Sequence, residues 1–240
     1  MSATFACLRG LPAVAHASFT FSAPNLAPGS PYRLIFVTSA STLGISSNIS
    51  TYNAYVTSVA GNDLSLPTTT WIAIASTDSV SALANVDSIC SGACLTAPIY
   101  LVDGSTVIAT NQAQFFGGTI LHAIGEDESG NTPSNSYVWT GSTTSGLVKV
   151  GFAMGDTDAE VGNSTQTTSG FYMDIGFPFG AHEPSTVSDT SLAMYAISGE
   201  LTVPEPKTSA PEPMSGSLLL VGGMATGLVR RLRRKRKSAA

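Results

Sequence analysis

The chain has 240 residues, with 11 Lys and Arg against 16 Asp and Glu and a formal net charge of −5. Seven of the basic residues lie at positions 230–237, so residues 18–213 carry three basic against sixteen acidic side chains, a formal charge of −13. So strong a negative charge on residues 18–213 would repel phosphate groups, which argues against nucleic acid as a partner.

The first 17 residues contain part of a secretory signal. The sequence Ala-His-Ala at 15–17 has the small-x-small pattern of a signal-peptidase site. Arg9, however, leaves only residues 10–14 as an apolar core, which is shorter than the usual 7 to 15 residues. We expect residues 1–17 to be a signal peptide that is truncated or that begins further upstream.

The body, residues 18–202, has the length of one domain. Residues 32–39 (YRLIFVTS) are apolar and β-branched and predict a buried strand. Residues 46–62 place apolar side chains at spacings of three and four, which predicts an amphipathic helix ending near Gly61. Further elements predicted in chain order are a strand at 70–77, a short helix at 79–86, a hairpin at 97–110, strands at 136–143 and 146–155, and a terminal strand at 191–204.

Cys90 and Cys94 are the only cysteines of the body. In an oxidising compartment this pair can close a small loop, so we predict a disulfide. The alternative is a zinc pair, but two cysteines alone lack the other two ligands of a structural zinc site.

Landmarks between residues 53 and 143 follow a set order: a helix, a Trp strand ending in Ser, a Pro-Ile hairpin with an Asp-Gly turn, and a Val-Trp-x-Gly strand. This order resembles that of endostatin-like domains, members of the C-type-lectin-like superfold. The resemblance implies an α+β, C-type-lectin-like single domain of mostly short strands with one or two helices. It does not extend to ligand chemistry, because the zinc-binding histidines of endostatin and the calcium-dependent sugar-binding motifs have no counterpart here. The matching residues are Trp71, Ala75, Ser76, Pro98, Ile99, Asp103, Gly104, Val138, Trp139 and Gly141.

Candidate catalytic and sugar-binding residues are few. His122 and His182 remain after signal removal, but neither accompanies a Gly-x-Ser-x-Gly or His-Glu-x-x-His motif. We therefore expect ordinary surface or core histidines, no catalytic residue and no cofactor. Trp71 and Trp139 could stack on sugars, but each lies in an apolar strand, so core packing is expected.

Two acidic stretches invite a calcium hypothesis. Residues 125–131 (GEDESGN) hold three consecutive acids, and residues 155–163 place Asp156, Asp158 and Glu160 at alternate positions, as calcium ligands often are. The later bidentate Glu of an EF-hand is missing. We expect solvated acidic loops and keep a calcium site at these three residues as the alternative.

The C-terminal region has three parts in sequence. A proline-rich linker, residues 203–213, ends in Pro211-Glu212-Pro213, whose extended backbone a protease can bind. The apolar run at 214–229 would form a helix of about 24 Å, short of the hydrocarbon core of about 30 Å. The basic tail, residues 230–240, would hold that end in the cytoplasm. Its charged residues are Arg230, Arg231, Arg233, Arg234, Lys235, Arg236 and Lys237.

This order of parts resembles the PEP-CTERM sorting signal of Gram-negative bacteria, with residues 214–229 as a short transmembrane sorting helix. Such signals are read by a membrane protease of the exosortase type, so the resemblance implies removal of the tail after export. The alternatives are a permanent C-terminal membrane anchor and a nucleic-acid-binding arm, since blocks of like charge often form such arms.

These features together predict an exported, non-enzymatic protein with a binding or adhesion role linked to exopolysaccharide and biofilm. The precursor would lie in the inner membrane, and the mature form at the cell surface or in the extracellular matrix. The expected partners are the exosortase-type protease, extracellular polysaccharide and, transiently, the inner membrane. The alternatives are an exported hydrolase with no recognisable site and a purely structural coat protein.

Overall fold

The computed structural model describes residues 20–90, 92–176, 179–180 and 191–206. The chain divides into two units, Met1–Pro204 and Glu205–Ala240, and every described helix and strand belongs to the first. These elements are mostly short strands with a few helices, which confirms the α+β class predicted from the sequence.

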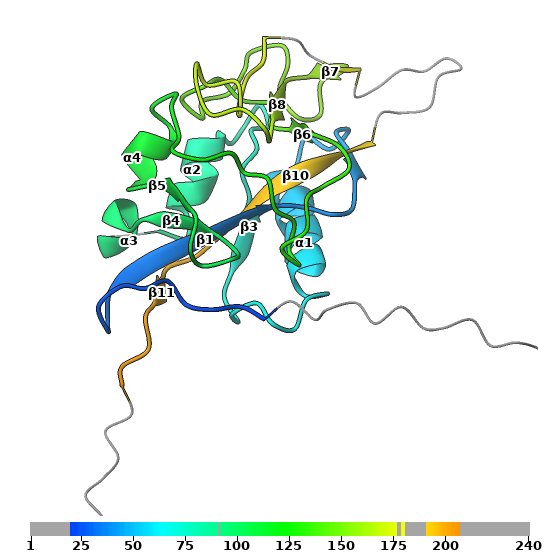
Figure 1. The fold of residues 1–240 in the computed structure, drawn as a ribbon. Coiled ribbons are helices and arrows are strands. Elements are labelled where there is room, and N and C mark those ends of the chain that lie inside the picture. Colours follow the sequence, from blue (N-terminus) through cyan, green and yellow to red (C-terminus); the bar gives the residue numbers. More distant parts are fainter. Residues whose placement is uncertain (1–19, 91, 177–178, 181–190, 207–240) are drawn as a thin grey trace, which may run out of the picture. The chain divides into compact units, whose positions relative to one another are not determined.

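The elements follow one another along the chain as labelled in Figure 1. The strands are β1 (Pro31–Val37), β2 (Thr42–Leu43), β3 (Trp71–Ala73), β4 (Ile99–Leu101), β5 (Val107–Ala109), β6 (Tyr137–Trp139), β7 (Asp158–Ala159), β8 (Val161–Asn163), β9 (Phe179–Gly180), β10 (Ser191–Ser198) and β11 (Leu201–Thr202). The helices are α1 (Ile49–Ala60), α2 (Ala82–Asp87), α3 (Ala93–Thr96) and α4 (Gln112–Phe115).

Strand β10 lies at the centre of the main sheet. One edge of β10 pairs antiparallel with β1, and the other pairs antiparallel with β3 and parallel with β6. Beyond β1 lie β4, which is parallel to it, and then β5, while β8 continues the sheet beyond β6. The first and last long strands of the unit are therefore neighbours in a mixed sheet.

Alternation along the central strands divides the core into two clusters. Leu34 and Phe36 of β1 face the side covered by α1, with Tyr52 and Val56 of that helix. Ile35 and its alternate neighbours face the other side, where Ala82 and Val86 of α2 and Phe115 of α4 pack. Figure 1 shows α1 and the α2–α4 pair on opposite sides of these strands. Because both faces are covered, residues 32–37 read as a continuous apolar run rather than an alternating one.

The predicted helix at 46–62 is confirmed as α1. The side chain of Asn48 caps its start by accepting a hydrogen bond from Ser50 N, and Gly61 caps its end. The predicted strand at 32–39, the short helix at 79–86 and the hairpin at 97–110 are also confirmed, as β1, α2 and β4–β5.

The predicted strand at 146–155 is wrong. This segment forms turns with only isolated bridges, Ser142 to Val148 and Thr77 to Met154. Gly146 and Gly155 have φ angles of +72° and +97°, which break an extended chain and bend the segment back on itself.

Both tryptophans belong to the core, as predicted. Trp71 is 4% exposed and packs edge-on against Phe36, while Trp139 is fully buried and donates from Nε1 to the Thr42 carbonyl at 2.9 Å. Neither indole is available for stacking on a ligand.

Within the residues the structure describes, no helix is both long enough and apolar enough to cross a membrane. The predicted signal peptide, the sorting motif Pro211-Glu212-Pro213, the helix at 214–229 and the basic tail all lie outside those residues, as does His182.

Candidate functional site

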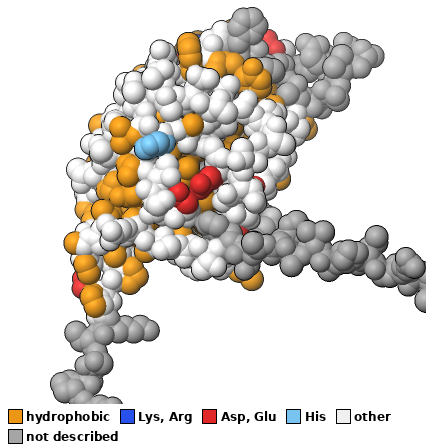
Figure 2. Space-filling view, in the orientation of Figure 1, with side chains coloured by type: hydrophobic (Ala, Val, Ile, Leu, Met, Phe, Trp, Pro, Cys, Tyr) orange, Lys and Arg blue, Asp and Glu red, His pale blue; other side chains and the backbone are white. Residues whose placement is uncertain are grey.

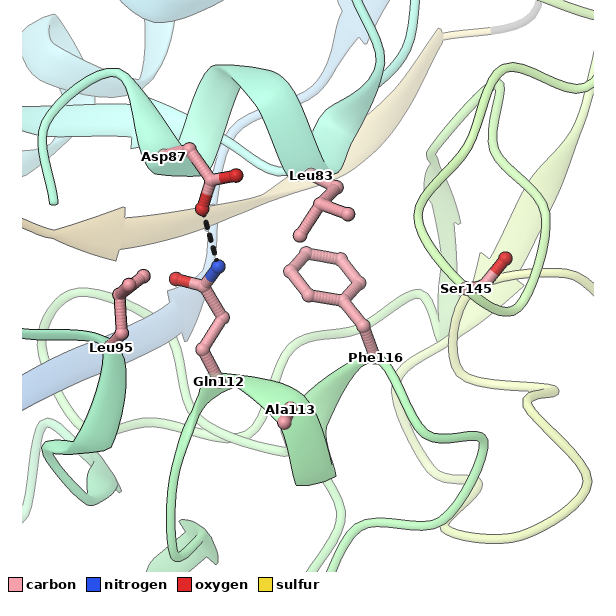
Figure 3. Close-up of a pocket in the computed structure, with 7 residues that line it drawn as sticks. All are labelled: Leu83, Asp87, Leu95, Gln112, Ala113, Phe116 and Ser145. Atoms are coloured by element: carbon pink, nitrogen blue, oxygen red, sulfur yellow. Dashed lines mark hydrogen bonds between the residues drawn. The ribbon is translucent and has the colours of Figure 1, made fainter. Parts of the chain in front are cut away.

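A pocket of about 480 Å³ opens between α2, α3, α4 and the loop that follows β6. Figure 3 shows α2 on one side of it and α4 on the other, with Ser145 supplied by the loop. The lining residues are Leu83, Asp87, Leu95, Gln112, Ala113, Phe116 and Ser145.

Apolar side chains form most of the pocket wall. The Phe116 ring packs edge-on against Phe115, with ring centroids 5.0 Å apart, and lies beside Leu83 in Figure 3. Gly146 lies against the same ring so closely that any side chain there would clash with it. The Gly146 carbonyl also accepts from Leu83 N at 2.9 Å, which ties the loop to α2 and fixes the position of Phe116.

A chain of hydrogen bonds runs from the core to the pocket. Arg33 of β1 lies on the same face as Ile35 and is fully buried. Its Nη1 donates to Gln112 Oε1 at 3.1 Å, and Gln112 Nε2 donates to Asp87 Oδ1 at 2.6 Å. Gln112 thus links a buried cation to an exposed carboxylate.

Arg33 also has backbone and sulfur partners. Its Nε donates to the Ser198 carbonyl at 2.8 Å, and Nη1 lies 3.5 Å from Cys90 Sγ. Nη2 is buried and makes no hydrogen bond to the described residues. Burial lowers the pKa of Arg33 to about 10, against the opposing effect of Asp87, so the guanidinium stays charged at neutral pH.

A disulfide joins Cys90 and Cys94 beside the pocket. The bonded pair connects the end of α2, which carries Asp87, to α3, which carries Leu95. Since Cys90 also contacts Arg33, the bond, the guanidinium and the pocket polar groups form one connected cluster.

Of the two histidines predicted to have no special role, His122 is the one that the structure describes, and it lies outside this pocket. His122 is exposed, and its Nδ1 lies 2.8 Å from the Val107 carbonyl at the edge of β5.

The acidic segment at 125–131 is not a solvated loop, contrary to the prediction. Asp127 and Glu128 are buried. Asp127 Oδ1 accepts from Ser129 N and Asn131 N, and Glu128 accepts from the backbone and hydroxyl of Ser39. Glu128 therefore fixes the loop to the chain beyond β1, and Asp127 accepts hydrogen bonds from within the loop.

The three acids of the calcium hypothesis do not converge. Asp156 accepts from Ala153 N, whereas Glu160 is buried 3.9 Å from Lys149 Nζ, which also lies 2.7 Å from Asp174. Over the described ranges, no group of three His, Cys, Asp or Glu side chains is placed to hold a metal ion. Asp156, Asp158 and Glu160 thus form no such site.

Three residues that line the pocket, Asp87, Gln112 and Phe116, and the buried Arg33 behind them were not predicted as functional. One signal was present, because Arg33 is the only charged residue in the apolar run at 32–37 and a buried charge requires partners. Its partners lie 57 to 165 positions away in the sequence, too far for spacing to reveal them.

No protein-family model matches the chain, and no curated protein matches it. What the pocket can bind is therefore inferred from its own residues and geometry.

Proposed function

We propose that this chain is an exported, non-enzymatic protein of the cell surface or extracellular matrix that binds a sugar unit of an extracellular polysaccharide in the pocket between α2 and α4. The observation that carries the proposal is the pairing of an apolar wall, including the Phe116 ring, with the hydrogen-bonded Asp87–Gln112 pair. A sugar has a matching surface, because its C–H face is apolar and its rim carries hydroxyl groups that donate and accept.

The same lining favours binding over cleavage. Of the residues that line the pocket, Asp87 alone carries a titratable group. Glycoside hydrolysis ordinarily needs two carboxyl groups on either side of the scissile bond. A single carboxylate held by an amide is better suited to accept hydrogen bonds than to exchange protons with a leaving group and a water molecule.

A lectin-like fold is part of this proposal. Its support is the order of elements: α1, then β3 with its buried Trp71, then the β4–β5 hairpin around Asp103 and Gly104, then β6 with Trp139. These elements follow the landmarks on which the endostatin-like resemblance depends.

Export and tail removal complete the proposal. Val203 hydrogen-bonds to the two residues before β1, donating to the Ser30 carbonyl and accepting from Gly29 N. The segment from Pro204 to the residue before Pro211 can extend about 25 Å, at roughly 3.6 Å per residue. An exosortase-type protease would then reach Pro211-Glu212-Pro213 without unfolding the body.

Binding of polysaccharides to the purified 240-residue chain tests the pocket. Ala113 is exposed on α4 and lines the pocket, so Ala113→Trp would fill it from the solvent side. We expect saturable binding that Ala113→Trp weakens by about tenfold or more, equal to about 1.4 kcal/mol. Ala84→Trp, at an exposed position on α2 that does not line the pocket, is the matched control and should bind normally.

Three results would contradict the proposal. Equal binding by both tryptophan variants would place the ligand elsewhere. Lack of saturable binding to any polysaccharide would favour a structural coat protein. Release of new reducing ends during the titration would identify a hydrolase.

A further inference from the structure

Asp87 presents one carboxylate oxygen to the protein and one to the pocket. Oδ1 accepts from Gln112 Nε2 at 2.6 Å. In Figure 3 the second oxygen points away from Gln112, toward the side on which Leu83 and Phe116 lie. No described residue donates a hydrogen bond to this second oxygen, and Asp87 is exposed, so the oxygen is open to a ligand donor.

The orientation of this carboxylate is fixed from behind. Gln112 is buried, and its carbonyl oxygen accepts from the Arg33 guanidinium, so its amide must present N–H groups toward Asp87. Arg33 itself is fully enclosed. A ligand in the pocket therefore meets the negative group of this chain of contacts and not the positive one.

The other charges of the described residues also favour a cationic ligand. Arg33 and Lys149 are the only Lys or Arg among the described residues, against thirteen Asp and Glu. Lys149 is engaged by Asp174 at 2.7 Å. Figure 2 shows acidic side chains but no Lys or Arg on the face it presents. Such a field attracts cations and repels uronic acids, sulfate and phosphate esters.

Resting on the proposed glycan-binding function, we infer that Asp87 selects sugar units that carry a free amino group. The ammonium group donates to the open oxygen of Asp87, and the apolar face of the sugar ring packs against Phe116. An ammonium group offers three donors and a positive charge, and an aromatic ring beside it adds to the attraction. An N-acetyl group removes the charge, and a carboxylate reverses it.

Matched oligosaccharides test the inference with the intact 240-residue chain. The probes are glucosamine oligomers, N-acetylglucosamine oligomers of equal length and a uronic acid oligomer, at about pH 6 so that the amine is protonated. We expect the amine form to bind about tenfold more tightly than the acetylated form, and the uronic acid form not to bind measurably. The preference should shrink as salt is raised.

Variants at Asp87 locate the effect. Asp87→Asn should bring the ratio of the two affinities to about one, because it lowers the affinity for the amine form far more than the affinity for the acetylated form. Asp87→Glu, which retains the charge, should keep a preference for the amine. Asp78→Asn makes the same charge change at an exposed position outside the pocket and should alter neither affinity.

The possible failures are distinguishable. Equal affinity of the wild type for the amine and acetylated forms would overturn the inference and leave glycan binding intact. A uniform loss in Asp87→Asn would mean that Asp87 only neutralises Arg33, which also overturns it. If neither oligomer nor any other polysaccharide binds, the proposed function fails and the inference fails with it.

Discussion

The side chain of Glu126 lies in an environment that disfavours its ionised form. Its backbone carbonyl accepts from Val37 N at 2.9 Å, which brings the residue against the end of β1. Its Oε2 is buried without a hydrogen bond to the described residues. Burial and the nearby charge of Asp103 together raise the pKa of Glu126 to about 7.

This shift predicts a loss of stability as pH rises. Between the ordinary pKa of 4.5 and the folded value of about 7, the folded state holds a proton that the unfolded state has released, so the free energy of unfolding falls with pH. Since the side chain is only partly buried, solvent screening limits the effect to about 1 kcal/mol, or roughly 2–4 °C in Tm. Glu126→Gln should remove that loss between about pH 5 and pH 8.

Thermal melts at the two pH values measure the difference. Glu200→Gln is the control, because Glu200 is exposed and the substitution is the same. A wild type and a Glu126→Gln variant with the same pH dependence of Tm would show that Glu126 ionises freely in the folded protein.

At the residue scale, the sequence predicted which apolar side chains are buried better than it predicted which polar residues pair with one another. The buried strand containing Arg33 and the buried indoles of Trp71 and Trp139 followed from local apolar pattern. The burial of Asp127, Glu128 and Glu160 did not, because each is compensated by backbone donors or by Lys149. Such compensation depends on tertiary contacts that a local pattern does not contain.

Among the elements, β3 depends on two helices to complete its hydrogen bonding. One edge of β3 pairs with β10. At its other edge, Asn53 Oδ1 of α1 accepts from Ala73 N at 2.9 Å, and Asn85 Nδ2 of α2 donates to the Ala73 carbonyl at 2.8 Å. The two amides also bond to each other at 2.9 and 3.0 Å. The pair thus closes the sheet edge and sets the position of α2, and with it of Asp87.

Removing one amide should therefore destabilise the whole arrangement. Asn85→Ala removes the side-chain donor to the Ala73 carbonyl and the acceptor for Asn53 Nδ2 in a largely buried site, at a cost of about 1–3 kcal/mol. Chemical denaturation should show a lower midpoint with an unchanged slope. Asn62→Ala, at an exposed position just beyond α1, should have little effect. Equal midpoints for the two variants would argue against the amide pair as a structural link.

The length of a helix or strand determines whether its hydrophobic periodicity can be recognised in the sequence. Twelve residues of α1 give more than three turns, enough to reveal the helical period. Helices α3 and α4 have four residues each and β7 has two, which are too short for any period to emerge. The pocket is built from α2, α3, α4 and a loop. Of its three helices, α2 was predicted from the sequence, whereas α3 and α4 were not.

On the scale of the whole molecule, the position of β11 determines what tail removal would leave. Pro31 and Tyr32 of β1 pair with Thr202 and Leu201, so the end of the body is bonded to its start. All described helices and strands precede Pro204. Cleavage near Pro213 would therefore remove none of them, and we expect the mature chain to have the same Tm as the precursor.

The tail itself should determine where the chain is found. With the tail in place, the apolar side chains of residues 214–229 would need lipid or protein around them and the basic cluster would bind the inner membrane face, so the precursor should fractionate with membranes. Once the tail is cut, residues 18–213 carry a formal charge of −13, and the chain should leave the inner membrane. Mass spectrometry should find a C-terminus at or near Pro213 in cells that have the exosortase-type protease and at Ala240 in cells that lack it.

The chain supplies its own control for the motif, because Pro204-Glu205-Pro206 repeats the tripeptide Pro211-Glu212-Pro213 without an apolar run directly behind it. If the protease reads the motif together with the helix that follows, Glu212→Ala should prevent processing and Glu205→Ala should not. An intact tail in both strains would support a permanent anchor instead. Processing blocked by Glu205→Ala alone would move the recognition site upstream, into the segment that begins immediately after Val203.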